Sequence, residues 1–234
     1  MFGDLSFRCA CRAAAPRPSM AVALRCLAAS VLVATSVATA DPIPPPDAQP
    51  AETGAPSPCQ LRLAELAAFA PSPPITGPGQ CTATDVVKVS AVLLADKHRV
   101  DLSPPATLRC PMATAVAQWI ADDVAPAIDA LGTSLRGIET LDSFDCRRRN
   151  GVAGAQVSEH GRANALDVRA FKLANGRVIE PNSASVSKPL RERLRDSACA
   201  RFSTVLGNGA DAYHESHVHV DVIKQIPERK GEFE

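Results

Sequence analysis

The stretch that decides how this chain folds around its candidate site is His214-Glu215-Ser216-His217-Val218-His219-Val220-Asp221, and its upstream counterpart is Ser158-Glu159-His160-Gly161-Arg162-Ala163-Asn164-Ala165-Leu166-Asp167. Four of the five histidines in the chain lie in these two stretches, each near a carboxylate. A structural zinc site usually takes four Cys or His ligands, whereas a catalytic site keeps three protein ligands and leaves a position for water. Histidines and an aspartate at open spacing therefore predict a catalytic zinc site in a metal-dependent hydrolase.

Residues 217–222 alternate between polar and apolar, which predicts a strand over residues 217–223 with one face toward water. Alternate residues of a strand share a face, so His217, His219 and Asp221 are expected on one side. The core on the other side is expected to receive Val218, Val220 and Val222. Two imidazoles side by side on a rigid strand can hold a metal ion and a proton-transfer group close together.

His160 and Asp167 are separated by a segment of small residues that includes Gly161, Ala163 and Ala165. Small side chains allow the chain to fold back on itself, so the imidazole and the carboxylate are expected to converge on one ion. The same small residues leave room for a substrate.

The pattern Ser-x-His, six residues, Asp, followed downstream by His-x-His, resembles the zinc metallopeptidases of the lysostaphin, D-Ala-D-Ala peptidase and hedgehog-like group. The wider sequence, over residues 59–223, resembles the bacterial extensin-like C-terminal domain family. The segments that carry this second resemblance are Cys110-Pro111-Met112-Ala113 with Trp119, Cys146-Arg147, Ser158-Glu159-His160, Asn164-Ala165-Leu166-Asp167 and the His-rich end.

The resemblance implies a Zn²⁺ ion with His160, Asp167 and His219 as its ligands. It implies that His217 transfers a proton or stabilises the transition state. It also implies that Arg147, which matches a substrate-holding arginine of the peptidases, binds a carboxylate of the substrate.

Two positions depart from the peptidase pattern. The glycine usually found three residues after the first histidine is Ala163 here, so a turn that needs a positive φ would be strained, and Gly161 is expected to supply the flexibility instead. Ser216 occupies the position of the glutamate that serves as base in D-Ala-D-Ala dipeptidases. The histidine-based variant of the mechanism is therefore favoured.

Other polar residues of the two stretches are expected to support the ligands. Asp221, Glu159 and Ser158 are the nearest candidates for hydrogen bonds that fix the imidazole tautomers. His214 is assigned to the same supporting group, with an ordinary loop residue as the alternative.

The overall composition excludes one class of partner. The chain has 234 residues with 25 basic and 25 acidic side chains, so it lacks the basic excess of nucleic-acid-binding proteins. Aromatic residues make up only 4% of the chain, too few for base-stacking platforms. The sequence leaves the oligomeric state open.

The N-terminal region predicts export. Residues 26–38 form an apolar run after Arg25 and end at Ala38-Thr39-Ala40, a small-x-small cleavage pattern. Residues 1–40 are therefore expected to be a signal peptide, with residues 1–19 a possible upstream extension. After cleavage we expect no membrane span and a periplasmic or secreted location in a bacterial envelope.

Two further segments follow in the expected organisation. Residues 41–58 are proline-rich and are expected to form a tether. Residues 59–234 are expected to form the extensin-like, zinc-peptidase-like domain.

Five cysteines remain after the predicted cleavage site, in a chain whose export would favour disulfides. The pairs Cys59–Cys81 and Cys110–Cys146 are favoured, and Cys199 would stay free or pair elsewhere.

Hydrophobic periodicity predicts one α+β domain with a small antiparallel sheet flanked by helices, and the resemblance implies the hedgehog and D-Ala-D-Ala-peptidase-like version of it. Helices are expected over residues 59–70, from Pro111 to Gly132 with a kink at Pro126 and Trp119 in the core, and from Ser187 through Ala200. Strands are expected over residues 86–94, 135–145, 166–173 and 217–223, with a hairpin at Asn175-Gly176 that leads into residues 177–179.

These expectations combine into one function. The chain is expected to be an exported zinc-dependent metallohydrolase that acts as a peptidase on peptide cross-links of peptidoglycan. The alternative is a non-catalytic, zinc-containing module that binds the cell wall or another protein, and a weaker alternative is a metal-free structural protein.

Overall fold

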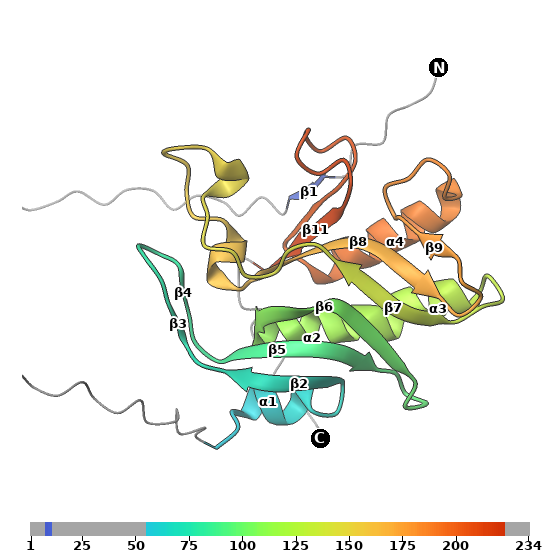
Figure 1. Ribbon diagram of the computed structural model, residues 1–234. Coiled ribbons are helices and arrows are strands. Elements are labelled where there is room, and N and C mark those ends of the chain that lie inside the picture. Colours follow the sequence, from blue (N-terminus) through green and yellow to red (C-terminus); the bar gives the residue numbers. More distant parts are fainter. Residues whose placement is uncertain (1–7, 11–54, 223–234) are drawn as a thin grey trace, which may run out of the picture. The chain divides into compact units, whose positions relative to one another are not determined.

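The computed structural model describes residues 8–10 and 55–222 (Figure 1). Apart from residues 8–10, the predicted signal segment lies outside these residues, as does most of the predicted tether. The elements, in chain order, are β1 (Arg8–Ala10), α1 (Pro58–Leu63), β2 (Ala67–Ser72), β3 (Ile75–Thr76), β4 (Thr82–Ala83), β5 (Val86–Leu93), β6 (Arg99–Arg109), α2 (Cys110–Trp119), η1 (Ile120–Val124), α3 (Ala125–Asp129), β7 (Leu135–Thr140), η2 (Arg149–Gly151), η3 (Glu159–Arg162), β8 (Ala165–Leu173), β9 (Val178–Ile179), α4 (Lys188–Arg201), β10 (Thr204–Leu206) and β11 (Val218–Asp221).

Within the described residues, nine strands form one sheet. Its order is β1-β10-β11-β8-β7-β6-β5-β2, with β9 paired to β8, while β3 and β4 form a separate hairpin. Helix α2 packs against β5 and β6, α4 packs against β10, and the two helices contact each other. Figure 1 shows the segment around residues 147–162 (yellow) and the loop before β11 (red) on the same side of the sheet. The α+β class is therefore confirmed.

The sheet is mixed, which corrects the expectation of a small antiparallel sheet. Strands β6 and β7 run parallel, with Asp101 opposite Gly137 and Ser103 opposite Glu139. A parallel pair needs a long crossover connection, and α2, η1 and α3 provide it between these two strands. The other strand pairs of this sheet are antiparallel.

The crossover helix is interrupted where a proline was expected to kink it. The interruption is the π-helical turn η1, at whose end Ala125 donates its N–H to the carbonyl of Ile120. Pro126, which has no N–H to donate, follows directly in the first turn of α3. The helix expected to run to Gly132 ends at Asp129, and Leu131 beyond it is 42% exposed.

Trp119 is a core residue, as predicted. Its side chain is buried, and its Nε1 donates a hydrogen bond of 3.0 Å to Ser197 Oγ on α4. Phe171 and Phe202 contact the indole ring edge-on, at centroid distances of 6.3 and 5.6 Å. The indole therefore joins α2, β8 and the end of α4.

The sequence patterns found most of the central elements and missed several peripheral ones. The helix expected over residues 59–70 ends at Leu63, and the chain then enters β2, which pairs with β5. Strand β6 contains Pro104 and Pro105, which argue against a strand at the level of local propensity. Strand β10 has only three residues, too few for a periodic signal. The hairpin at Asn175-Gly176 is confirmed by the pairing of β9 with β8.

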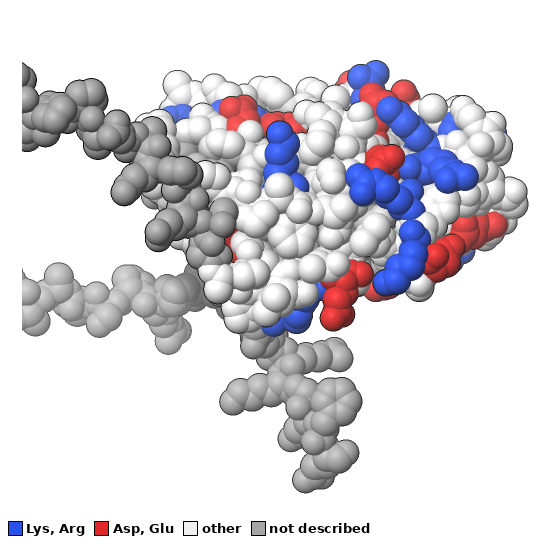
Figure 2. All heavy atoms as spheres, turned by 60° about the horizontal axis from the view of Figure 1, so that its bottom comes forward, with Lys and Arg blue, Asp and Glu red and all other residues white. Residues whose placement is uncertain are grey.

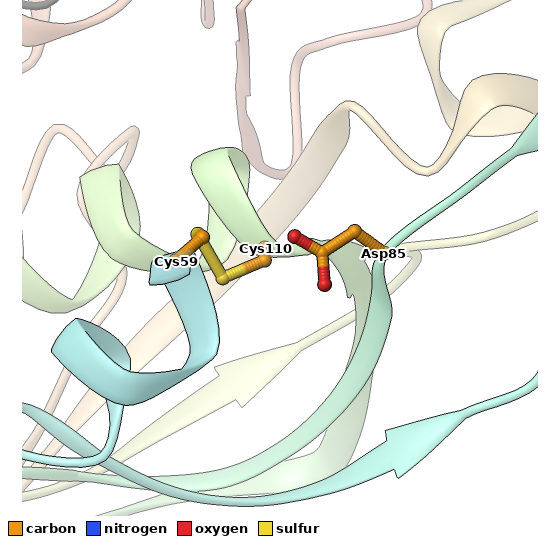
Figure 3. A group of neighbouring side chains, drawn as sticks. All are labelled: Cys59, Asp85 and Cys110. Carbon is orange, nitrogen blue, oxygen red and sulfur yellow. A yellow bond between two sulfur atoms is a disulfide. The ribbon is translucent and has the colours of Figure 1, made fainter. Parts of the chain in front are cut away.

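The disulfides join Cys59 to Cys110 and Cys81 to Cys146, so the predicted pairing is wrong. Helices α1 and α2 lie against each other, which brings Cys59 to the start of α2, with Cα atoms 6.1 Å apart (Figure 3). Cys81 follows the turn of the β3–β4 hairpin and reaches the loop after β7. Cys199 is disulfide-bonded as well. The bridges are compatible with an extracytoplasmic location.

One face of the surface is seen in Figure 2. Lys and Arg side chains gather at one end of this face with Asp and Glu side chains among them, and most of the remaining face is uncharged. Among the described residues, ion pairs such as Arg201–Asp122 at 3.0 Å show the same mixing of charges. No helix within residues 8–10 and 55–222 is long and apolar enough to cross a bilayer.

Removing the α1–α2 disulfide should destabilise the fold, because the bridge closes a segment whose ends are 51 residues apart. For the double variant Cys59→Ala/Cys110→Ala, the expected loss in the free energy of unfolding is about 2–5 kcal/mol. Urea unfolding followed by Trp119 fluorescence measures it. An unchanged unfolding midpoint would contradict the assigned pairing.

Candidate metal centre

Three side chains from separate elements meet at the centre of the site. His160 belongs to η3, Asp167 to β8 and His219 to β11. In the antiparallel pair of β11 and β8, His219 lies directly opposite Asp167. The structure thus brings together the three residues that the sequence pattern assigned as ligands, and their donor atoms all lie within 4.8 Å of one another.

The distances between the donor atoms suit one small metal ion. His160 Nε2 lies 3.1 Å from His219 Nδ1 and 3.3 Å from Asp167 Oδ1, and His219 Nδ1 lies 2.9 Å from that same oxygen. Tetrahedral ligands at zinc–nitrogen and zinc–oxygen bond lengths would be about 3.3 Å apart. Three donors at this spacing need only small shifts to share one ion.

Hydrogen bonds on the outer side of each ring fix the tautomers. His160 Nδ1 donates to the backbone carbonyl of Ser143 at 2.8 Å, and His219 Nε2 donates to Asp221 Oδ2 at 3.1 Å. His160 Nε2 and His219 Nδ1 are then left as lone-pair acceptors that face Asp167 Oδ1. Three converging acceptors repel one another unless a cation lies between them, and this is the arrangement found around protein-bound metals.

The charge balance also favours a divalent cation. The exposed fraction is 4% for Asp167, 5% for Asp221, 2% for His160 and 7% for His219. Among the described residues, neither Asp167 nor Asp221 forms an ion pair with a lysine or arginine. Two buried carboxylates with neutral imidazoles carry two negative charges, which one divalent ion neutralises.

In the absence of a metal ion, a proton on His219 offsets part of the negative charge. Burial would raise the pKa of Asp167, but its contacts with His160 and His219 together outweigh burial and hold that pKa well below its ordinary value. Burial would lower the pKa of His219, but its hydrogen bonds to Asp167 and Asp221 raise it to about 9. The metal-free site therefore holds a proton on His219 at neutral pH.

His217 lies beside the three ligands without joining them. Its Nε2 is 3.5 Å from Asp167 Oδ2, whereas His160 and His219 contact the other oxygen, Oδ1. Burial lowers the pKa of His217; the nearby Asp167 opposes this, and the neighbouring histidines reinforce it. A neutral imidazole at the edge of a metal site is suited to accept a proton.

Arg147, expected to bind a substrate carboxylate, is engaged by two carboxylates of its own chain. Its Nη2 donates to Asp142 Oδ2 at 2.9 Å, and its Nε lies 2.9 Å from Asp145 Oδ2. Burial would lower the pKa of Arg147, but the hydrogen bond to Asp142 and the negative charges of Asp142, Asp167 and Asp145 together outweigh burial and raise the pKa. Asp142 Oδ2 also lies 3.6 Å from His160 Nδ1. Arg147 therefore holds in place a carboxylate that lies next to the outer nitrogen of the His160 ring.

The residues expected to support the ligands divide into two groups. Asp221 contacts a ligand ring directly through His219 Nε2, and Ser158 accepts a 3.4 Å hydrogen bond from the backbone N–H of His160. Glu159 instead binds Arg162 and Asn164, so it stabilises the turn rather than a ring.

His214 lies next to the other site histidines. Its ring is 5.3 Å from that of His217 and 5.5 Å from that of His219, measured between centroids. Its Nδ1 is 2.6 Å from Asp211 Oδ1. His214 therefore packs in the site and does not supply one of the three clustered donors.

The turn that carries His160 uses the two small residues differently from expectation. Ala163 adopts the left-handed conformation with φ 53°, so the positive φ falls on the alanine. Gly161 is needed for space, because a Cβ there would lie 2.8 Å from Val157 Cγ1 and 3.1 Å from Cys81 Sγ. The left-handed turn costs about 1–2 kcal/mol for a residue with a Cβ. Backbone hydrogen bonds from Ala163 N–H to His160 O and from Arg109 N–H to Ala163 O hold it closed.

The site opens into a cavity of about 450 Å³. All three candidate ligands and His217 line it, with Arg149 and Tyr213 on its walls. A cavity of this size is within the range of pockets that bind small molecules or short peptide segments.

Sequence reasoning missed several residues that support the site. Asp142, Ser143 and Asp145 follow β7, and the polar run that they form could have indicated a site at the end of that strand. The decisive atom of Ser143 is its backbone carbonyl, which carries no residue-specific signal. Asn182, which contacts the loop before β11, had no motif around it.

A second cluster of potential ligand residues, Cys59, Asp85 and Cys110, is not a metal site. Figure 3 shows the two sulfur atoms joined in the disulfide, so neither is available as a thiolate. The Asp85 carboxylate accepts hydrogen bonds from Ser57 Oγ and Gln60 Nε2 at the first turn of α1. Asp85 therefore anchors the start of that helix.

The chain belongs to a known family of domains. A profile of the family described as "Extensin-like protein C-terminus" matches residues 57–231, which include every residue of the site described above. Neither the curated proteins nor the solved structures contain a match. Family membership is thus established, and the chemistry of the site is inferred from its own geometry.

Loss of a ligand should abolish metal binding more completely than loss of a supporting carboxylate. For Asp221→Asn we expect Zn²⁺ affinity to fall about 10–100-fold, because the group that orients His219 loses its charge. For Asp167→Asn the fall should exceed that range. Isothermal titration calorimetry measures both, with His98→Ala as the control because His98 lies outside the cluster. Equal affinities in the two site variants and the wild type would contradict the assignment.

Metal binding should release a proton at neutral pH. Because the pKa of His219 is about 9 in the metal-free site, the ion must displace that proton below pH 9. Between pH 7 and 8, the apparent Zn²⁺ affinity should therefore rise by about tenfold per pH unit. Calorimetry in two buffers of different ionisation enthalpy counts the protons, and an affinity independent of pH would refute the prediction.

Proposed function

We propose that this chain is an exported, zinc-dependent hydrolase that acts as a peptidase on the peptide cross-links of peptidoglycan. The observation that carries the proposal is the convergence of His160, Asp167 and His219 on one point inside a cavity, with His217 beside them. A site with three protein ligands and access to solvent has the composition of a catalytic zinc site rather than a structural one.

A bound Zn²⁺ would supply a Lewis acid that polarises an amide carbonyl and lowers the pKa of water to about 7. His217 would accept one proton from the attacking water and return it to the leaving nitrogen. The water oxygen then bonds to the carbonyl carbon as the C–N bond breaks, so amide hydrolysis is balanced without another reagent. Asp167 holds His217 from its second oxygen while the first faces the ligand rings.

Three features support a cell-wall peptide as the substrate. The predicted signal peptide and proline-rich tether suit a periplasmic or secreted enzyme, and the two disulfides are compatible with that location. The motif resembles wall-cleaving peptidases. Arg149 on the cavity wall provides positive charge for the carboxylates of wall peptides, whereas Arg147 pairs with Asp142 and Asp145.

A non-catalytic module is the second candidate. It is favoured by Ser216, which stands where the D-Ala-D-Ala dipeptidases have their glutamate base. In that case the domain would keep Zn²⁺ for stability and bind the wall or a partner protein. Stoichiometric zinc and retained affinity for peptidoglycan, without release of peptides, would select this candidate.

Turnover should depend on His160 and His217 in different ways. His160→Ala should lose both Zn²⁺ and peptide release from purified peptidoglycan, because a ligand is gone. His217→Ala should keep Zn²⁺ and lose about 10²–10⁴-fold in rate, the contribution of a positioned proton-transfer group. Muropeptide profiles after digestion measure release, with His98→Ala as the control. Peptide release that stays at the wild-type rate in His160→Ala would overturn the proposal.

A further inference from the structure

The loop that carries His214 and His217 has no regular structure of its own. It spans residues 207–217, between β10 and β11, and consists of turns and bends. His217 is its last residue and precedes the first ladder pair of β11, Val218 with Val168. The position of His217 is therefore not set by strand pairing.

A buried asparagine from another part of the chain contacts this loop. Asn182 lies between β9 and α4 and is 8% exposed. Its side-chain Nδ2 donates to the backbone carbonyls of His217 at 2.6 Å, His214 at 3.0 Å and Glu215 at 3.4 Å. Three surrounding acceptors identify this side of the amide as the donor.

We propose that Asn182 is a positioning residue that holds His217 against Asp167 and so acts on the reaction through His217. The inference rests on the proposed function. The shortest of its three hydrogen bonds is to His217 itself, and the other two fix the chain just before that residue. A displacement of about 1 Å of a reacting group can cost roughly 10²-fold in rate.

The metal ligands are held by other contacts. The carbonyl of Ser143 orients His160, Asp221 orients His219, and Asp167 sits within the ladder of β8 and β11. Removing the Asn182 amide should therefore lower turnover and leave the affinity for Zn²⁺ nearly unchanged. A residue that only stabilises the fold would lower both together.

Asn182→Asp is the most direct variant, because it keeps the shape and replaces the donor by an oxygen that faces three carbonyl oxygens. Asn182→Ala is the second variant, in case the buried charge prevents folding. Asn208→Ala is the matched control, since Asn208 lies in the same loop and donates a 3.4 Å hydrogen bond to the backbone carbonyl of Asn182.

Three measurements are made on each folded variant. We expect Zn²⁺ affinity within about threefold of wild type and a kcat on peptidoglycan about 10–100-fold lower with little change in KM. We also expect the nuclear Overhauser contact between the His214 and His217 rings, whose centroids are 5.3 Å apart, to be lost in the metal-free protein. The control variant should keep all three values.

The inference is overturned if the ring contact persists in both variants, or if Zn²⁺ affinity and kcat fall in parallel. If the wild-type protein releases no peptides, the proposed function fails. The ring contact then still decides whether Asn182 positions His217, because that readout needs neither metal nor turnover.

Discussion

The site depends on one pairing, the antiparallel register of β11 with β8 that sets His219 opposite Asp167. A shift of one residue would turn His219 toward the core and bring a valine to the site, because successive side chains of a strand point to opposite faces. The buried valines 218 and 220 hold the register from the core side. The hydrophobic pattern of a four-residue strand thus fixes the geometry of the candidate metal centre.

Around that pairing, the protein buries two carboxylates that form no ion pair with a lysine or arginine among the described residues. Asp167 and Asp221 are buried. The outer ring nitrogens of His160 and His219 form hydrogen bonds, which leaves the lone pair of the other ring nitrogen directed toward Asp167. Such an arrangement is costly for an apolar interior unless a cation occupies it. The turn at Ala163 adds backbone strain at the same site, because a residue with a Cβ adopts the left-handed conformation there. Backbone hydrogen bonds hold the turn in that conformation.

The cluster of His160, Asp167 and His219 was predicted through the resemblance to the metallopeptidase motif. Spacing alone indicated that His160 and Asp167 could converge across a turn of small residues and that His217 and His219 share one face of a strand. The sequence was sufficient for Trp119 and for the Asn175-Gly176 hairpin. It was not sufficient for β6, whose prolines oppose a strand locally, or for the disulfides, whose pairing follows from the packing of α1 on α2. The contacts of Ser143 and Asn182 involve backbone carbonyls, which are the same in every residue type and leave no pattern to read.

X-ray absorption spectroscopy of the zinc-loaded protein identifies the ligands of the bound ion. We expect one ion per chain, with nitrogen and oxygen ligands at about 2.0–2.2 Å and scattering from two imidazoles. A bound ion with sulfur ligands at about 2.3 Å, or a protein that takes up no stoichiometric zinc, would contradict this expectation.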